Sequence, residues 1–262
     1  AFAAALMLVT AVGILRRPLH RTLRAHWRLL LVLGLTAIAL PNLSVVAAED
    51  RISSGMASVV GTTVPIMTFL IVIVFLRHRA YTHARMAGVL VAVAGVAVYA
   101  GWNDLLHHAS DLASIGIMMA GGCVFAVNGV LAESKTREID GYSLTALVLL
   151  LGTLYLAALA FVFERHVVQF PTSRELLFIA LAGTLGNAVA FLGYFILLRR
   201  ATAYFTSFYA YLVPTLGVFL GVVFLDEPIT TNHVVGLVMV LLGLRLLSSG
   251  TIPPAVPSHE KA

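Results

Sequence analysis

The sequence has few charged residues, a single cysteine and no motif for catalysis. Only 11% of its 262 residues are charged, whereas soluble domains have roughly 25%. A chain of this size with so little polar surface is expected to be an integral membrane protein. Its one cysteine, Cys123, cannot form an internal disulfide. HExxH, phosphate-binding-loop and GxSxG motifs are also absent, so we expect neither an enzyme nor a bound cofactor.

Long apolar runs take the place of the missing polar residues. The chain is 60% hydrophobic, its mean hydropathy is +0.97, and nine apolar segments stand out along it. Most approach the ~20 residues with which a helix crosses a bilayer, and none alternates apolar with polar residues as membrane strands do. The sequence therefore predicts an all-α integral membrane protein. The segments are Ala1–Leu15, Leu29–Ala48, Ser54–Leu76, Arg85–Trp102, Leu112–Ala132, Tyr142–Phe163, Leu176–Leu198, Ala201–Leu225 and His233–Leu247.

Positive charges gather at every second connection between these segments. Because cytoplasmic connections collect Lys and Arg, this pattern predicts a multi-pass protein with a cytoplasmic C-terminus, and we expect a plasma membrane, in particular a bacterial inner membrane. It also explains the net charge of +5 by contact with anionic lipid headgroups rather than with nucleic acid. Only Arg51, Arg165 and Arg174 lie in the opposite connections. The other fourteen are Arg16, Arg17, Arg21, Arg24, Arg28, Arg77, Arg79, Arg85, Lys135, Arg137, Arg199, Arg200, Arg245 and Lys261.

The chain repeats itself with a shift of 149 residues. The stretch Arg51–Arg79 matches Arg200–Pro228, and glycines before and after these stretches match as well. An internal repeat in a membrane protein is a pointer to its working site. The matched pairs are Arg51 with Arg200, Ser58 with Ser207, Pro65 with Pro214, Gly34 with Gly183 and, at a shift of 148, Gly88 with Gly236 and Gly95 with Gly243.

The two copies cross the membrane in opposite directions, because an odd number of spans separates them. The first segment, Ala1–Leu15, is short and ends at Arg16-Arg17, which predicts a truncated helix; a cleaved signal peptide is the alternative. The repeat then predicts a ten-helix, two-half inverted-repeat bundle whose first helix is missing, so that nine helices are visible. Its halves are residues 1–103 and 112–250, and residues 251–262 form a disordered cytoplasmic tail.

Three sets of residues carry a family resemblance. They are Leu40-Pro41-Asn42; the small and polar stretches that lead to a central proline, Ser53-Ser54-Gly55 to Pro65 and Thr202 to Pro214; and Phe224-Leu225-Asp226-Glu227-Pro228 followed by Gly236. Together with the repeat they resemble the drug/metabolite transporter superfamily, in particular its EamA-type ten-helix members, over nearly the whole chain. The first copy departs from this pattern, since Arg77-His78-Arg79 stands where the second has its acids.

The resemblance implies a carrier that moves small metabolites, such as amino acids, related compounds or drugs, outward by alternating access. Its partners would be a small-molecule substrate and the bilayer, and a homodimer is left open. Two other classes stay open. One is a non-transporting membrane partner or assembly protein. The other is a membrane-embedded enzyme acting on lipids, which would need clustered catalytic His, Asp or Glu residues.

Polar side chains within the apolar spans are candidates for binding the substrate. Such groups are costly in lipid unless they are paired or line a wet cavity. The alternative is that they join helices by hydrogen bonds. The resemblance favours some of these helices as cavity walls and ranks Asn128 below the candidates on them. The substrate-binding candidates are Asn42, Thr63, Asn187, Tyr194 and Tyr211.

Two prolines and four acids complete the candidate residues. Pro65 and Pro214 each remove a backbone donor and are candidate hinges, with an ordinary bend as the alternative. Candidate gate residues at the outer mouths are Glu49, Asp50, Asp226 and Glu227, with solvated interface charge as the alternative. The pair His107-His108 lies near two aspartates but lacks a complete ligand set, so we expect no metal site.

Overall fold

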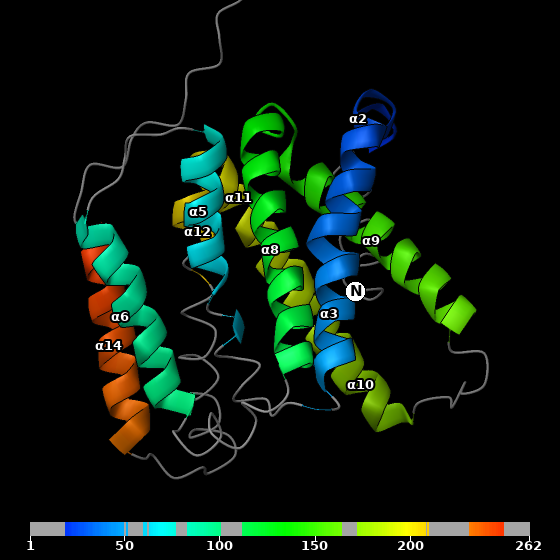
Figure 1. The fold of residues 1–262 in the computed structure, drawn as a ribbon. Helices are drawn as coiled ribbons and strands as arrows, with labels where there is room; N and C mark the ends of the chain where they lie inside the picture. The colour runs from blue at the N-terminus through cyan, green and yellow to red at the C-terminus, as the bar shows by residue number, and fades with distance from the viewer. Residues whose placement is uncertain are drawn as a thin grey trace, which may run out of the picture. The chain divides into compact units, whose positions relative to one another are not determined.

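The structure is a computed structural model that describes residues 19–49, 51, 60–61, 63–76, 83–100, 112–163, 172–207, 209 and 231–248. Every regular element in this part of the chain is a helix, which confirms the predicted all-α fold class (Figure 1). The helices are α2 (Leu19–Gly34), α3 (Leu40–Glu49), α5 (Val64–Leu76), α6 (His83–Ala100), α8 (Leu112–Lys135), α9 (Gly141–Phe163), α10 (Ser173–Leu181), α11 (Ala190–Arg200), α12 (Ala203–Ser207) and α14 (Thr231–Ser248). Two π-helical segments, η1 (Leu35–Ala39) and η2 (Ala182–Val189), join α2 to α3 and α10 to α11.

Several of these helices have membrane-spanning length. By length and apolar composition, three described stretches can cross a bilayer: Leu19–Ala48, Ala113–Lys135 and Gly141–Val162. Five predicted apolar segments begin and end within three residues of the observed helix boundaries. They correspond to α6, α8, α9, α10–η2–α11 and α14. Long apolar runs therefore locate most of the described helices correctly.

Two helices differ from the prediction at their N-terminal ends. The helix predicted from Leu29 begins at Leu19, because a basic amphipathic stretch precedes its apolar part. The prediction starts another helix at Ser54, but α5 begins only at Val64. Residues 60–61 are helical, and a turn at Thr63 separates them from α5. Pro65 lies in the first turn of α5. N–H groups in the first turn make no hydrogen bond within their own helix, so a proline there costs α5 none.

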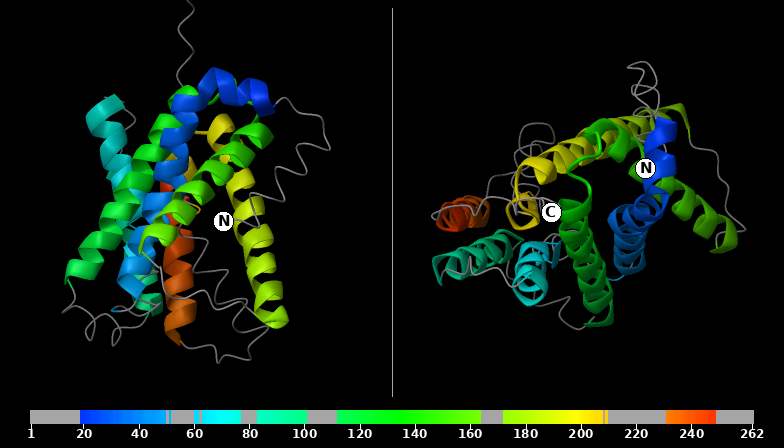
Figure 2. Two further views of the ribbon diagram at one scale, coloured as in Figure 1. Left: turned by 90° about the vertical axis from the view of Figure 1, so that its right-hand side faces the viewer. Right: turned by 90° about the horizontal axis from the view of Figure 1, so that it is seen from above.

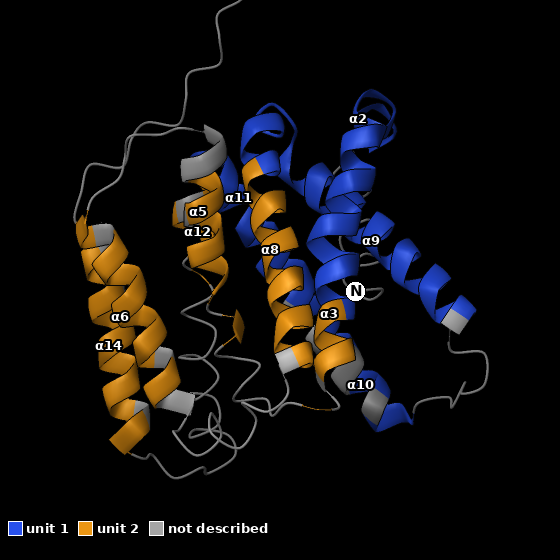
Figure 3. Ribbon diagram, viewed as in Figure 1, with its two compact units in different colours: residues 1–43, 131–201 blue, residues 44–130, 202–262 orange. Residues whose placement is uncertain are grey.

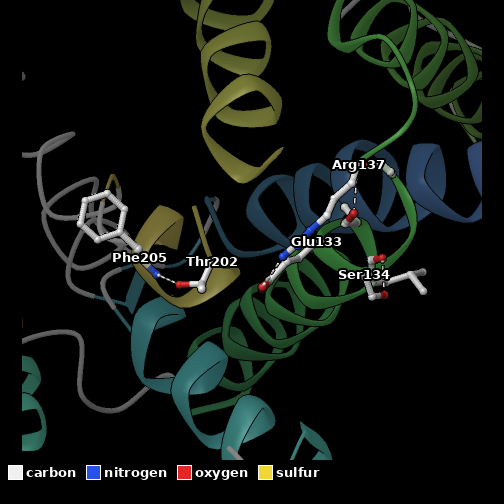
Figure 4. A network of polar contacts seen from close by, with 8 residues as sticks. Glu133, Ser134, Arg137, Thr202 and Phe205 are labelled. Atoms are coloured by element: carbon white, nitrogen blue, oxygen red, sulfur yellow. Dashed lines mark hydrogen bonds and ion pairs between the residues drawn. The ribbon is translucent and has the colours of Figure 1, made fainter. Parts of the chain in front are cut away.

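Side-chain caps define where two helices begin. Asp140 precedes α9, and its Oδ2 accepts hydrogen bonds from the backbone N–H and the hydroxyl of Ser143, each at 3.0 Å. Thr202 precedes α12, and its Oγ1 accepts a hydrogen bond from the N–H of Phe205 at 3.2 Å (Figure 4). Each cap satisfies a donor that the first helical turn leaves without a partner.

The first of two compact units consists of residues 1–43 and 131–201 (Figure 3). In it, α2 and η1 pack against α9 through glycines. A Cβ at Gly34 would lie 3.0 Å from Leu151 Cβ and 3.1 Å from the backbone N of Gly152, and a Cβ at Gly152 would meet the side chain of Ile38. Glycine at both positions therefore allows a backbone approach that any larger residue would prevent.

The second compact unit consists of residues 44–130 and 202–262. Its α6 and α14 lie side by side and run antiparallel. A Cβ at Gly95 would lie 2.8 Å from the carbonyl oxygen of Gly236, and a Cβ at Gly243 would lie 2.7 Å from the carbonyl oxygen of Gly88. The four glycines that match at a shift of 148 are thus the residues through which α6 and α14 meet.

Candidate functional site

The start of α5 is built around a break in the helix. The hydroxyl of Thr63 donates to the carbonyl oxygen of Val60 at 2.7 Å, and its backbone N–H donates to the same oxygen at 3.0 Å. Pro65 is buried and has no N–H group, so it donates no bond to the carbonyl of Gly61 four residues earlier. The helix is thus interrupted just before Pro65, as broken helices at membrane binding sites are.

The middle of α8 packs against this break. A Cβ at Gly122 would lie 3.2 Å from Val64 Cγ2, which fixes a close approach of α8 to the first residue of α5. Six residues further on, Asn128 is completely buried and makes polar interactions. The family resemblance ranks Asn128 below the substrate-binding candidates, and the structure places it on a helix that contacts the broken one.

A third element, α12, also contacts α5. Thr206 in α12 is fully buried, and its hydroxyl has no hydrogen-bond partner in the described part of the chain. Just beyond α12, the ring of Tyr209 meets the ring of Phe125 from α8 edge to face, with centroids 6.2 Å apart. Unit 2 thus brings α5, α8 and α12 together with an amide and several hydroxyls among apolar residues.

The remaining described candidates lie in unit 1. Asn42 is exposed on α3, and its amide donates to the carbonyl oxygen of Ile38 at 2.7 Å. Asn187 lies half-buried in η2 and makes polar interactions. Tyr194 lies on α11, with its ring edge to face with Phe195 at 5.2 Å between centroids. The fifth candidate, Tyr211, falls outside the described residues.

The candidate hinges and gates are described only in part. Pro65 begins α5, whereas Pro214 falls outside the described residues, as do Asp50, Asp226 and Glu227. Glu49 is the last residue of α3. In the described ranges, no group of three or more His, Cys, Asp or Glu side chains is arranged to hold a metal ion.

The two π-helical segments are a feature that sequence patterns did not reveal. Shifted by 149 positions, Leu35–Ala39 falls on residues 184–188, which lie inside Ala182–Val189. The same shift aligns Ile38, whose carbonyl accepts the Asn42 amide, with Asn187 itself. A π segment rearranges the bonding of a helix locally and is frequent at functional sites. A hydropathy pattern records apolar length and does not register one extra residue per turn.

Comparison with known proteins identifies the family of this chain. The EamA-like transporter family matches residues 1–101 and 112–249. The chain belongs to the EamA-like transporter family. It is therefore a multi-pass membrane transporter rather than an enzyme, and the resemblance to drug/metabolite transporters is confirmed.

Individual relatives of this EamA-family chain are distant. An "Uncharacterized transporter" of Archaeoglobus fulgidus is 24% identical over 82% of this chain and 75% of its own length. A "Probable terminal-alkyne amino-acid exporter" of Streptantibioticus cattleyicolor is 26% identical over 95% of this chain and 82% of its own length. A protein crystal structure shares the fold with a TM-score of 0.80, covers 94% of this chain and 84% of its own, and is 18% identical.

Proposed function

We propose that this EamA-family transporter exports amino acids or related small metabolites across the bacterial inner membrane by alternating access. The observation that carries the proposal is the buried hydroxyl of Thr206, which lies in α12, a helix that contacts α5, and has no partner among the described residues. Buried polar groups are normally hydrogen-bonded, so a buried hydroxyl without a described partner, in a helix that contacts the broken α5, suits a polar substrate. The Streptantibioticus cattleyicolor relative supports amino acids as the class.

The candidates that the sequence suggests remain our proposed substrate contacts. Thr63 and Tyr211 belong to the two repeat-related helices, while Asn42, Asn187 and Tyr194 supply amides and a phenol from other helices. Pro65 and Pro214 would act as hinges, and the acids Glu49, Asp50, Asp226 and Glu227 would line the outer mouth. Amides and hydroxyls without a central carboxylate suit a zwitterion better than an ion of one sign, because they both donate and accept hydrogen bonds.

We further propose that the chain is the nine-helix part of a ten-helix bundle with two inverted halves. The glycine contacts between α6 and α14 support this arrangement, because Gly95 meets Gly236 while its repeat partner Gly243 meets Gly88. This reciprocity is what a pseudo-two-fold axis between two repeats requires. The matching positions of η1 and η2 support the same axis. With the basic connections inside, the C-terminus would face the cytoplasm.

Efflux from liposomes tests the proposed function. The purified protein would be reconstituted in liposomes loaded with labelled amino acids, including alkynyl ones, and with sugars of similar size. We expect selective efflux of one class of amino acid, and a change on imposing a pH gradient would reveal proton coupling. Protein that unfolds cooperatively but releases no amino acid faster than sugar would contradict the proposal.

A further inference from the structure

The helix α2 starts ten residues before the apolar span that the sequence predicts. Its first part, residues 19–28, contains three arginines and two histidines and no acid. At His26 the backbone leaves helical geometry, with φ −128° and ψ 20°. The left panel of Figure 2 shows the result: the first part of α2, in dark blue, bends away from the axis of the rest of the helix. A bend at this point turns a continuous helix into a spanning part and a separate basic part.

The basic part of α2 is amphipathic. Before the bend, ideal helical geometry places Leu19 and Leu23 within roughly 40° of each other on the helix circumference, and Arg21 and Arg24 at least about 100° away from them. Leu19 and Leu23 thus form an apolar side and Arg21 and Arg24 a basic side, and Trp27 and Arg28 follow directly after the bend. Large apolar side chains remain open on this segment, since Leu23 is 37% and Trp27 50% exposed. An exposed tryptophan beside arginine is typical of a helix at the boundary between lipid and water.

The arginines of this segment form no ion pair within the described part of the chain. Among the described residues, none forms an ion pair with Arg21, Arg24 or Arg28, and the Arg28 guanidinium lies 5.2 Å from the centroid of the Trp27 ring. The stretch related to it by the repeat, residues 168–177, carries one arginine and one glutamate and so has no net charge. The positive charge is thus specific to the end of the helix that we assign to the cytoplasmic side, where membranes are anionic.

We propose that residues 19–28 lie in the cytoplasmic membrane interface as an amphipathic helix that binds anionic lipid headgroups. The apolar side enters the boundary between headgroups and acyl chains, and the three arginines contact lipid phosphates. The bend at His26 makes this possible, because a straight extension of the spanning helix would carry the arginines out of the headgroup layer and into water. The inference depends on membrane insertion, which the family establishes, and its test needs no transported substrate.

Tryptophan quenching by brominated lipids tests this contact directly. The chain has two tryptophans, so Trp102→Phe leaves Trp27 as the reporter, and Trp27→Phe gives the background signal of Trp102. The protein would be placed in bilayers that contain equal mole fractions of phosphatidylglycerol and phosphatidylcholine, with either one or the other brominated. We expect brominated phosphatidylglycerol to quench Trp27 at least about twofold more than brominated phosphatidylcholine, because each arginine near the surface favours anionic lipid.

Charge variants complete the test. In the triple variant Arg21→Gln, Arg24→Gln, Arg28→Gln, the quenching ratio should fall to about one, since the electrostatic preference is gone. The matched triple variant with lysine at the same positions should keep the preference, because it keeps the charge. A ratio near one in the parent protein, no change in the glutamine variant, or loss of the preference in the lysine variant would each overturn the proposal. Because quenching is read without transport, this result is independent of the efflux assay.

Discussion

Threonine hydroxyls in this chain divide into two groups. Several donate to the carbonyl oxygen four residues earlier in their own helix, as Thr68 does to Val64 at 2.9 Å and Thr145 to Gly141 at 2.7 Å. Thr206 is as deeply buried as these two, but its hydroxyl makes no such bond. At the scale of single residues, this difference separates hydroxyls that bond within their own helix from one that has no partner in the described part of the chain.

Replacing Thr206 with valine should impair transport without destabilising the protein. The change removes a hydroxyl that has no partner in the described structure and keeps the side-chain shape, so the free energy of unfolding should not fall. If the hydroxyl binds substrate, the KM for efflux should rise about three- to tenfold, the worth of one neutral hydrogen bond. The measurement is efflux from liposomes together with thermal unfolding in detergent.

Thr68→Val is the matched control for this prediction. Thr68 lies in α5, is equally buried, and uses its hydroxyl within its own helix. We expect its efflux KM to stay close to that of the parent. Equal effects of the two variants on KM, or a large loss of stability in Thr206→Val, would remove Thr206 from the site.

A second residue-scale prediction concerns Arg199, at the end of α11. Its Nη2 and Nε donate to the carbonyl oxygen of Arg137, 62 residues away, at 2.9 and 3.3 Å. Nη2 of Arg137 in turn lies 3.6 Å from Oε1 of Glu133, and Figure 4 shows this ion pair. Arg199→Gln should lower the free energy of unfolding by about 1.5 to 3 kcal/mol, because charged donors to a long-range acceptor are lost.

Thermal unfolding read by a thiol-reactive dye can measure this loss, because Cys123 is the single cysteine and is half-buried in α8. The neighbouring Arg200→Gln is the control, since Arg200 is exposed, and its melting temperature should match that of the parent. An unchanged melting temperature for Arg199→Gln would show that the bond to Arg137 contributes nothing to stability.

At the scale of elements, the contact between α6 and α14 should depend on the absence of side chains. Gly95→Ala would place a Cβ within 2.8 Å of three atoms of α14, two of them backbone. Backbone cannot rotate away as a long side chain can, so the two helices must separate. We expect a loss of about 1 to 3 kcal/mol, as for overpacked cores, and a similar loss for Gly243→Ala.

The control for this element is Gly116→Ala in α8. A Cβ there meets no atom within 4 Å, and the residue is exposed. Alanine in a helix favours the folded state over glycine, so this variant should melt at or slightly above the temperature of the parent. Equal melting temperatures for Gly95→Ala and Gly116→Ala would mean that α6 and α14 do not pack closely.

The apolar runs in the sequence predict some helix boundaries well and others poorly. Apolar length located α8 and α9 to within three residues at each end, because lipid demands a minimum apolar run. The same measure missed the first ten residues of α2, where the sequence is polar and amphipathic rather than apolar. It also missed the break before Pro65 and the two π segments, which depend on individual backbone hydrogen bonds.

At the scale of the whole molecule, the two compact units do not coincide with the two predicted halves. Each unit combines residues from both: unit 1 takes residues 1–43 and 131–201, and unit 2 takes residues 44–130 and 202–262. Helices that match across the repeat, such as α6 and α14, fall in the same unit. A repeat is read along the chain, whereas compactness depends on contacts between copies, so the sequence could suggest the symmetry without revealing these units.

The candidate site, too, depends on contacts that cannot be read along the sequence. Thr63 was predicted because the family resemblance favours its helix as a cavity wall, and the structure places it at the break in the helix. The resemblance ranked Asn128 below the candidates and did not single out Thr206, because the burial of a side chain and the use of its hydrogen bonds by neighbours are not visible in a sequence. Residue type and spacing suggest where polar groups lie in a span, whereas burial and the use of hydrogen bonds become visible only in the packed structure.

The proposed orientation can be tested at both ends of α9. Ser134 precedes this helix and Thr172 follows it, and both are exposed. In a Cys123→Ala background, we expect Thr172→Cys to react with a membrane-impermeant maleimide in intact cells. Ser134→Cys should react only after the cells are permeabilised, because it lies among the basic residues that mark the cytoplasmic side. The reverse pattern would invert the whole assignment, and labelling of both in intact cells would mean that α9 does not cross the membrane. The reverse pattern would also remove the basis for placing the basic part of α2 at the anionic leaflet. This pair of variants therefore tests the orientation on which the proposed contact between residues 19–28 and anionic lipid depends.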